Sequence, residues 1–577
     1  MGKYLKKFEN HSEYESFTAT TEFIKPNVSI CVREYDVHFN PWTWADEYLT
    51  TVALEDGTIS FNIWKSMGTE YITSISYSTD NGETWTTTNN VNDKEEHLTI
   101  AVNVNEGDKV MWKGDATQLG YNDEDDYGDV VGSFFSSTCE FDAKGNVMSL
   151  LYGDDFDGET TIENDYAFAN LFSDYDEENE CLVVNAKDLS LPATTLADYC
   201  YYYMLWNCTS LTTAPELPAT TLADYCYNGM FSECTSLTTA PELPATTLAQ
   251  FCYDSMFVNC TSLTTAPELP ATTLASNCYQ YMFASCTNLT IAPELPATTL
   301  ANYCYESMFG GCTSLTTAPE LPATTLTDFC YDSMFNGCTS LTTAPELPAT
   351  TLVEACYQYM FQGCTNLTTA PELPATTLAN YCYRSMFNDC ASLTTAPELP
   401  ATALTDYCYS YMFQGCTGLT TAPELPATTL ANYCYSGMFM GCTSLTAAPE
   451  LPATTLSESC YGSMFRGCTS LTTAPELPAT TLAKSCYTRM FNDCASLTTA
   501  PELPATTLAN YCYSNMFYGC TSLNNITCLA TNISATNCTI NWVQNVAASG
   551  TFTKAASMTS WTTGNNGIPN GWTQQNS

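Results

Sequence analysis

Cysteine is the residue that offers the most chemistry, because the 577-residue chain contains 31 of them. Twenty-six occur as pairs, such as Cys226 and Cys234, that are eight residues apart and recur every 26 residues. Zinc sites need clusters of the Cys-x-x-Cys kind, and the sequence has none. Eight helical residues span roughly 12 Å, whereas a disulfide needs Cα atoms within about 7 Å. We therefore expect small, buried, reduced thiols, with disulfides between equivalent cysteines of neighbouring repeats as the alternative.

Carboxylates are the second group that could act together. Twelve repeats carry a Glu after Ala-Pro, from Glu216 and Glu242 to Glu502. At a spacing of ~5 Å, neighbouring carboxylates repel by about 0.8 kcal/mol in water. We expect these side chains to spread into solvent, and the alternative is weak Ca²⁺ binding between them. The acidic segment 122–126 is a similar case, since it lacks the spacing of an EF-hand loop. No defined metal site or cofactor is expected.

Constellations typical of enzymes are missing from the sequence. The three histidines, His11, His38 and His97, all precede the repeats. No Gly-x-Ser-x-Gly, Walker loop or His-Glu-x-x-His motif occurs. The carboxylates also lack the unequal surroundings that make one an acid and another a base. The sequence thus predicts no catalytic residues and a protein that is not an enzyme.

A repeat of 26 residues must position these side chains, and it runs in 13 copies from Leu191 to about Cys528. The copy at 217–242 reads LPATTLADYCYNGMFSECTSLTTAPE. Leu222, Cys226 and Met230 recur at i, i+4 and i+8, which predicts the apolar face of a short helix. An extended return follows the second cysteine. We expect stacked copies to share one core, with Leu on Leu, Cys on Cys and Phe on Phe. At roughly 5 Å per rung, 13 rungs would make a rod of about 65 Å.

Prolines limit the sheet that the extended returns can form. Each rung places one Pro, such as Pro241, within the return and another, such as Pro244, three residues later. Proline cannot donate to a strand ladder, so we expect strands of about two to four residues. The row of tyrosines that contains Tyr201 and Tyr227 is expected to be mostly packed, with its hydroxyls at the surface. Stacking of this row on sugars is the alternative.

The segment MFSECTSLTTAPELP at 230–244 resembles the AFxGCxSLxxxxIP core of BspA-like leucine-rich repeats. Met230, Phe231, Cys234, Leu237 and Leu217 fall on matching positions, and the resemblance extends over all 13 copies. This repeat is a few residues longer than the usual unit and carries the additional Pro. The resemblance implies surface proteins that adhere to host cells, matrix or other proteins.

Upstream of the repeats, β-branched, aromatic and polar residues alternate between turn signals at 80–82, 106–108 and 144–146. This pattern predicts a small antiparallel β-sandwich. The segment Ser78–Trp85 matches the S-x-D-x-G-x-T-W pattern of an Asp-box, which marks a β-hairpin. Asp-boxes also occur in sialidases, so glycan processing is a minor alternative.

We therefore predict an α+β chain with a β-sandwich domain followed by a parallel leucine-rich-repeat-type solenoid with caps. The predicted divisions are a docking peptide at 1–19, the sandwich at 20–150, an amino-terminal cap rung at 151–190, the solenoid at 191–528 and a carboxy-terminal cap at 529–577.

The first 17 residues resemble a short amino-terminal motif of virion proteins from crAss-like bacteriophages. The matching residues are Lys6, Lys7, Phe8, His11, Tyr14 and Glu15. The resemblance implies a docking peptide, and an ordinary exposed leader is the alternative. The chain shows neither a signal-peptide pattern nor an apolar run long enough to span a membrane. We expect synthesis in a host cytoplasm and no membrane insertion.

Charge narrows the range of partners. The formal net charge is −46, which disfavours nucleic acids and anionic membranes. The positions that vary between otherwise similar rungs are the candidates for binding. They include Trp206, Gln250, Tyr281, Tyr359, Arg384, Tyr411, Arg466, Lys484, Arg489 and Tyr518. We expect them to line one helical side of the rod, either as a recognition face for a glycan or protein or through drift of an unselected surface.

These observations predict a virion surface protein of a gut bacteriophage, such as a head or tail fibre or a decoration protein. It would join other virion proteins through its amino-terminal region and adhere to a host cell, glycan or mucus. A homo-oligomer is compatible with this role. A bacterial cell-surface adhesin of the BspA type is the alternative.

Overall fold

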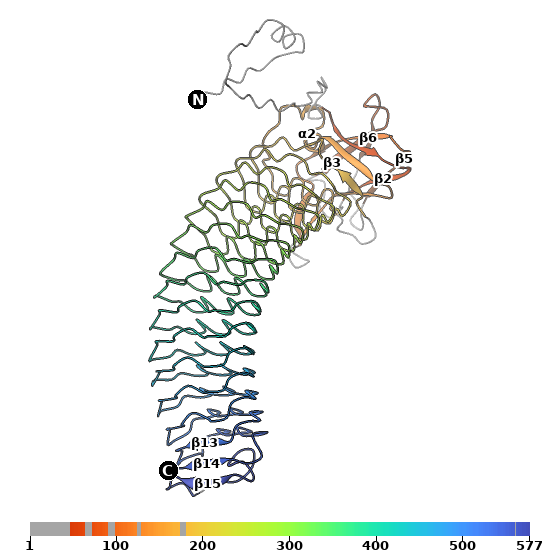
Figure 1. Cartoon of the computed structure of the whole chain (residues 1–577). Helices are drawn as coiled ribbons and strands as arrows, with labels where there is room; N and C mark the ends of the chain where they lie inside the picture. Colours follow the sequence, from red (N-terminus) through yellow and green to blue (C-terminus); the bar gives the residue numbers. More distant parts are fainter. Residues whose placement is uncertain (1–46, 64–71, 90–97, 124–128, 174–179, 560) are drawn as a thin grey trace, which may run out of the picture.

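The computed structural model describes residues 47–63, 72–89, 98–123, 129–173, 180–559 and 561–577. It shows a small β domain at one end of a long, curved rod (Figure 1). The predicted docking residues, at 6–15, lie outside the described part of the chain.

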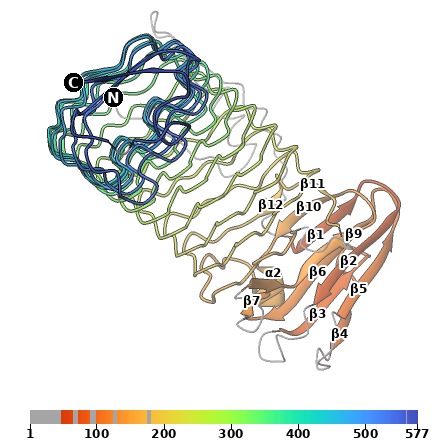
Figure 2. The same cartoon turned by 90° about the horizontal axis from the view of Figure 1, so that it is seen from below.

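The β domain is built from two main sheets (Figure 2). The larger has the order β11-β10-β1-β6-β3-β4, with β12 also paired to β10, and the smaller has the order β5-β2-β9. Aromatic side chains from the two sheets meet in a shared core. The ring centroid of Phe61 lies 6.1 Å from that of Trp112 and 4.8 Å from that of Phe135. The strands are β1 (Leu49–Ala53), β2 (Gly57–Ile63), β3 (Ile72–Ser78), β4 (Thr86–Asn89), β5 (Leu98–Val104), β6 (Lys109–Ala116), β9 (Phe134–Ser137) and β10 (Phe141–Asn146), with β7 (Gly120–Asp123) and β8 (Asp129–Gly132) as a separate pair.

The predicted hairpin at Ser78–Trp85 is confirmed, because β3 and β4 on either side of it pair antiparallel. The Asp80 carboxylate accepts hydrogen bonds from the backbone N–H of Thr84 at 2.8 Å and from its hydroxyl at 2.5 Å. Asn81 and Gly82 adopt left-handed φ values of 57° and 84°, which the turn requires.

The larger sheet leads directly into the rod. Strand β10 pairs in parallel with β11 (Val183–Asn185) and with β12 (Leu189–Ser190), and Asn185 then bridges Thr213 in the next rung. The only helices among the described residues are α2 (Ser149–Tyr152) and the 3₁₀ turn η3 (Gly153–Asp155). One hydrophobic core runs without a break from the sandwich through the rungs.

Each rung contains successive four-residue turns where we predicted a helix, so that prediction is wrong. We call this stretch, 223–234 in the rung that starts at Leu217, the turn segment. Tyr225, Gly229 and Glu233 have φ values of 58°, 60° and 65°. A left-handed residue at every fourth position is incompatible with a right-handed helix. The spacing i, i+4, i+8 is common to a helix and to consecutive four-residue turns, so apolar spacing could not separate them.

Hydrogen bonds in the turn segment alternate between two directions. The N–H of Tyr225 donates to Gln250 in the next rung at 3.0 Å, whereas the N–H of Cys226 donates back to Ala223 in its own rung at 3.4 Å. The pattern continues, so five N–H groups in this rung bond to the next rung: those of Tyr225, Tyr227, Gly229, Phe231 and Glu233. Backbone groups at the surface of the rod are thus paired without a helix or a continuous strand.

Like residues stack on like residues in the core, as predicted. The rings of Tyr227 and Tyr253 lie 5.9 Å apart and those of Phe231 and Phe257 lie 5.5 Å apart, nearly parallel in both pairs. The tyrosine row is fully buried, which confirms its packing but makes the predicted surface position of its hydroxyls wrong. Five of these hydroxyls are buried without a hydrogen-bond partner, those of Tyr201, Tyr227, Tyr331, Tyr409 and Tyr487. Each such group costs about 1–3 kcal/mol, which the stacked core must offset.

The second cysteine of each rung has a specific structural role. The thiol of Cys260 donates to the carbonyl of Phe231 at 3.0 Å, and that of Cys286 donates to Phe257 at 3.0 Å. These carbonyls belong to the preceding rung, so the thiol links neighbouring rungs from inside the core. The cysteines in the described part of the chain are buried, as expected, and burial raises the pKa of Cys312 to about 12.

On the opposite side, successive rungs are joined by isolated bridges between residues that flank the Ala-Pro-Glu-Leu-Pro segments, such as Thr265 to Ile291 and Thr343 to Thr369. The prediction of strands in every rung is therefore wrong, because the prolines suppress the ladder more completely than expected. Where these prolines end, strands form: β13 (Asn525–Cys528) pairs in parallel with β14 (Thr551–Lys554), which pairs with β15 (Thr573–Asn576). Trp542 is fully buried beside this sheet and donates to Gly567 at 2.8 Å.

The buried thiols generate the first prediction. At pH 8 the native chain should react with Ellman's reagent at only a small fraction of its 31 cysteines, because burial raises the thiol pKa and excludes the reagent. Denaturation in guanidinium should expose all 31. Rapid reaction of most thiols in the native state would contradict the packing described here.

Candidate functional site

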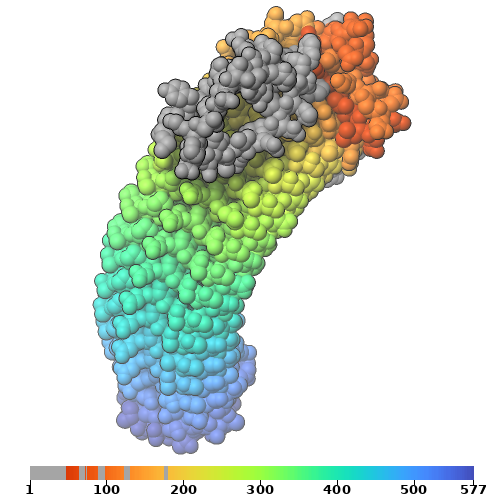
Figure 3. All heavy atoms as spheres, turned by 45° about the horizontal axis from the view of Figure 1, so that its top comes forward, coloured from red at the N-terminus to blue at the C-terminus, as the bar shows by residue number. Residues whose placement is uncertain are grey.

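The variable residues lie in the turn segments, which are hydrogen-bonded from rung to rung and together form one surface, here called the turn face. The rungs follow one another in sequence order along the curved rod (Figure 3). All ten predicted binding residues belong to this face, although on turns and not on a helix. They occupy rows about four residues apart in each rung. Gln250, Tyr281, Arg466, Lys484 and Arg489 are exposed, and Trp206, Tyr359, Arg384, Tyr411 and Tyr518 are half-buried.

A row of aromatic rings on this face was missed by sequence reasoning. It occupies the first left-handed position of most rungs and is interrupted where that position holds Asn277, Ala355, Ser459 or Ser485. Tyr199 stacks on Tyr225 and Tyr225 stacks on Phe251, both at 4.4 Å between centroids. A second run joins Tyr407 to Tyr433 at 4.6 Å. The ring faces cover one another, so this row presents mainly ring edges to a ligand. The signal in the sequence was the aromatic residue directly before the first cysteine.

The second left-handed row shows that variable positions depend on their neighbours. A β-carbon added at Gly229 would lie 2.2 Å from the ring of Tyr203, and one added at Gly437 would lie 2.3 Å from the ring of Tyr411. Tyr281 is likewise followed by a small residue, Ser307, at the same position of the next rung. A tyrosine on one rung therefore requires a small residue on the next, and this row has not varied independently.

Between these two rows runs a third, the polar row, which consists of Asn228, Asp254, Gln280, Glu306, Asp332, Gln358 and Arg384. Amide donors lie next to carboxylate acceptors along it. Asn228 donates to Asp254 at 2.9 Å, Gln280 donates to Glu306 at 2.7 Å, and Gln358 donates to Asp332 at 3.1 Å.

Burial changes the acidity of this row. It raises the pKa of Asp254 to about 6, although hydrogen bonds from Ser255 and Asn228 act in the opposite direction. The pKa of Glu306 is raised to about 7, first by burial and then by the neighbouring charge of Asp332. The pKa of Asp332 is raised to about 6 by burial, against hydrogen bonds from Ser333 and Gln358 and the charge of Arg384. Asp254, Glu306 and Asp332 therefore keep their protons to a higher pH than ordinary carboxylates do.

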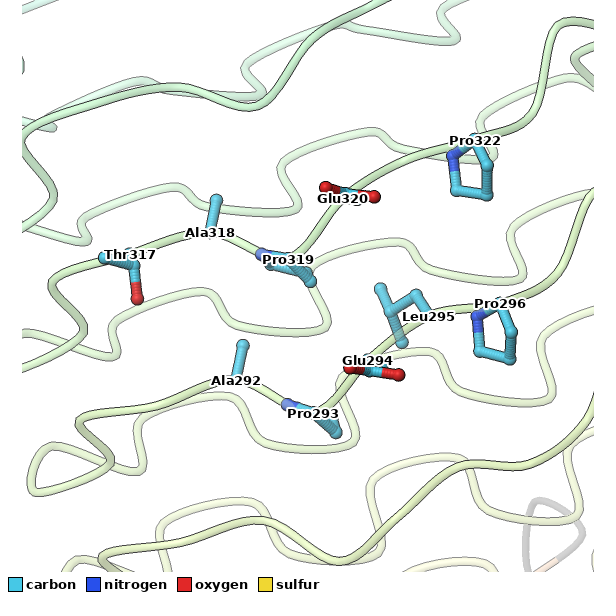
Figure 4. A pocket seen from close by; sticks show the side chains of 10 residues that line it. All are labelled: Ala292, Pro293, Glu294, Leu295, Pro296, Thr317, Ala318, Pro319, Glu320 and Pro322. Carbon is cyan, nitrogen blue, oxygen red and sulfur yellow. The ribbon is translucent and has the colours of Figure 1, made fainter.

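The opposite face carries the Glu ladder and shallow grooves between rungs (Figure 4). One groove of about 370 Å³ is lined by Pro293, Glu294, Pro319 and Glu320, and its glutamates are exposed. Among the described residues, no group of three or more His, Cys, Asp or Glu side chains is arranged to hold a metal ion. Calcium binding by this ladder remains a prediction. No helix in the described part of the chain is long and apolar enough to cross a membrane.

Comparison with known families matches the BspA type leucine-rich repeat region to residues 194–342, 276–420, 328–472 and 433–554. The chain belongs to this family. The BspA-type repeats therefore account for the rod, and the resemblance drawn from the Met-Phe…Cys…Leu pattern is confirmed. No curated protein matches the chain.

Two solved structures are similar to this BspA-type chain. One is a leucine-rich repeat protein from Eubacterium ventriosum, with 14% identity and a TM-score of 0.31 over 75% of this chain and 96% of that one. The other is the TLR13–ssRNA13 complex, with 13% identity and a TM-score of 0.20 over 67% of this chain and 49% of that one.

The coupling between rungs can be tested at Gly437. Gly437→Ala should lower the thermal midpoint more than Gly441→Ala, because both residues have positive φ but only Gly437 faces a tyrosine ring within 2.3 Å. The backbone penalty alone is roughly 1–2 kcal/mol. Adding Tyr411→Ser should remove the difference, and a double-mutant cycle measures the coupling. Equal destabilisation by the two alanines would argue against rung-to-rung complementarity.

The raised pKa of Glu306 generates a pH prediction. The folded state holds this proton up to about pH 7, whereas the unfolded chain releases it near the ordinary value of 4.5. The contribution of Glu306 to stability is therefore largest at low pH and declines as the pH rises from about 4.5 to 7. Glu306→Gln should reduce the difference in thermal midpoint between pH 5 and pH 7.5. Glu294→Gln, on the exposed ladder, is the matched control and should leave that difference nearly unchanged.

Proposed function

We propose that the chain is a non-enzymatic binding protein that uses its turn face for adhesion. The observation that supports this most directly is the division of variation within each rung. The buried rows keep the same residue types in nearly every copy, whereas the differing side chains gather on the turn face. The rod extends from the β domain, which would serve as the base (Figure 1).

Two settings are supported by different observations. Membership of the BspA-type family favours a bacterial cell-surface adhesin. Residues Lys6, Lys7, Phe8, His11, Tyr14 and Glu15 favour the surface of a bacteriophage particle, as a head or tail fibre or a decoration protein. In either setting the ligand is a host protein, a glycan or mucus, and the net charge of −46 disfavours nucleic acids.

Immunogold labelling with an antibody against the rod distinguishes these settings. Gold on phage capsids or tails would establish the virion role, and deletion of residues 1–17 should then remove the protein from particles without changing the thermal midpoint of the rod. Gold on bacterial envelopes with bare particles would support the cellular adhesin. Incorporation of the truncated protein into particles would contradict a docking role for the amino-terminal peptide.

A further inference from the structure

A longer repeat is superimposed on the single rungs. The three rungs at 243–320 recur at 321–398, 78 positions later, with the same distinctive side chains on the turn face. The matching pairs are Phe251 and Phe329, Asp254 and Asp332, Gln280 and Gln358, Tyr281 and Tyr359, and Tyr303 and Tyr381. The two units therefore present two niches with the same aromatic rings, which differ in the side chain between those rings: Glu306 in the first and Arg384 in the second.

The second niche contains a cation that the chain itself provides. The guanidinium carbon of Arg384 lies 5.5 Å from the ring centroid of Tyr359 and 5.7 Å from that of Tyr381. Its charge also acts to lower the pKa of Asp332. Two rings thus lie beside one guanidinium group, with the carboxylate of Asp332 within range of its charge. This arrangement suits arginine in particular because its planar group stacks on rings.

The first niche has the same rings but no cation. Glu306 stands where the second unit has Arg384, and its carboxylate lies 3.3 Å from the hydroxyl of Tyr281. Tyr281 is 37% exposed, and the pKa of Tyr303 is raised first by burial and then by the charge of Glu306. No Lys or Arg occurs anywhere from residue 188 to 383. Neighbouring carboxylates Asp254 and Asp332 add further negative charge around Glu306.

We propose that the niche formed by Tyr281, Tyr303 and Glu306 binds an arginine side chain on a basic segment of a partner protein. The guanidinium group would lie against the two rings and pair with Glu306, as Arg384 does with its rings from within the chain. This proposal rests on the proposed binding role of the turn face, and it identifies the chemistry of one contact on that face.

The test is titration calorimetry of the full chain with a hexa-arginine peptide at about pH 8, above the raised pKa of about 7 of Glu306, so that this carboxylate is charged. A salt concentration of about 150 mM screens diffuse charge attraction. Glu306→Arg supplies the cation internally and should weaken binding at least tenfold. Glu294→Arg makes the same charge change on the opposite face and should weaken it less than twofold. Arg384→Glu should create a second niche and raise the number of bound peptides from one to two.

Glu306→Arg and Arg384→Glu each introduce the residue that the chain already carries at the equivalent position three rungs away. Thermal midpoints of the variants check that they fold. Tyr281→Ser, which copies the residue of neighbouring rungs, provides an independent variant and should also weaken binding. Equal losses for Glu306→Arg and Glu294→Arg, or no saturable binding by the unmodified chain, would overturn the niche. If the unmodified chain binds the peptide but the antibody against the rod labels neither bacterial envelopes nor phage particles, the niche is supported and the adhesive function fails.

Discussion

The alternation of hydrogen bonds in the turn segment is the constraint on which the rod depends. Every second N–H from Tyr225 to Glu233 bonds to the following rung, and the ones between close the turns within their own rung. This pattern requires a left-handed residue at each fourth position, which costs free energy for residues other than glycine. Asn, Asp, Ser and Gly dominate the third such position for this reason. Because each of these inter-rung hydrogen bonds joins residues 25 positions apart, equivalent side chains of successive rungs lie next to one another.

Register between rungs decides what the core and surface can contain. In the core, like side chains stack at 5.5–5.9 Å, so each row tolerates one shape, as the Phe231 and Tyr227 rows show. At the surface, the same register makes neighbours complementary in size, as with Tyr411 above Gly437, or in hydrogen bonding, as with Gln280 beside Glu306. The side chains that distinguish one rung from another are thus limited by the rungs on either side.

Much of this architecture could be predicted from the sequence, because the period of 26 residues and the identity of the buried rows are explicit in it. The hairpin at Ser78–Trp85 was also predictable from its turn residues. The helix was not, since Leu222, Cys226 and Met230 fit a helix and a series of turns equally well. The left-handed conformation of the tyrosines before the first cysteine could not have been predicted either, because aromatic residues rarely adopt it and do so here where the alternating hydrogen bonds require it. The polar row required knowledge of which residues meet across rungs 26 positions apart.

The two sides of the rod differ in how firmly successive rungs are joined. On the turn face five backbone hydrogen bonds link the rung of Leu217 to the next, whereas the proline-containing segments opposite make only isolated bridges. A pulling or bending force should therefore separate the rungs first on the side of the prolines, while the backbone hydrogen bonds of the turn face keep the rungs joined. Such a rod can absorb mechanical load by bending while the side chains along its better-joined face keep their spacing.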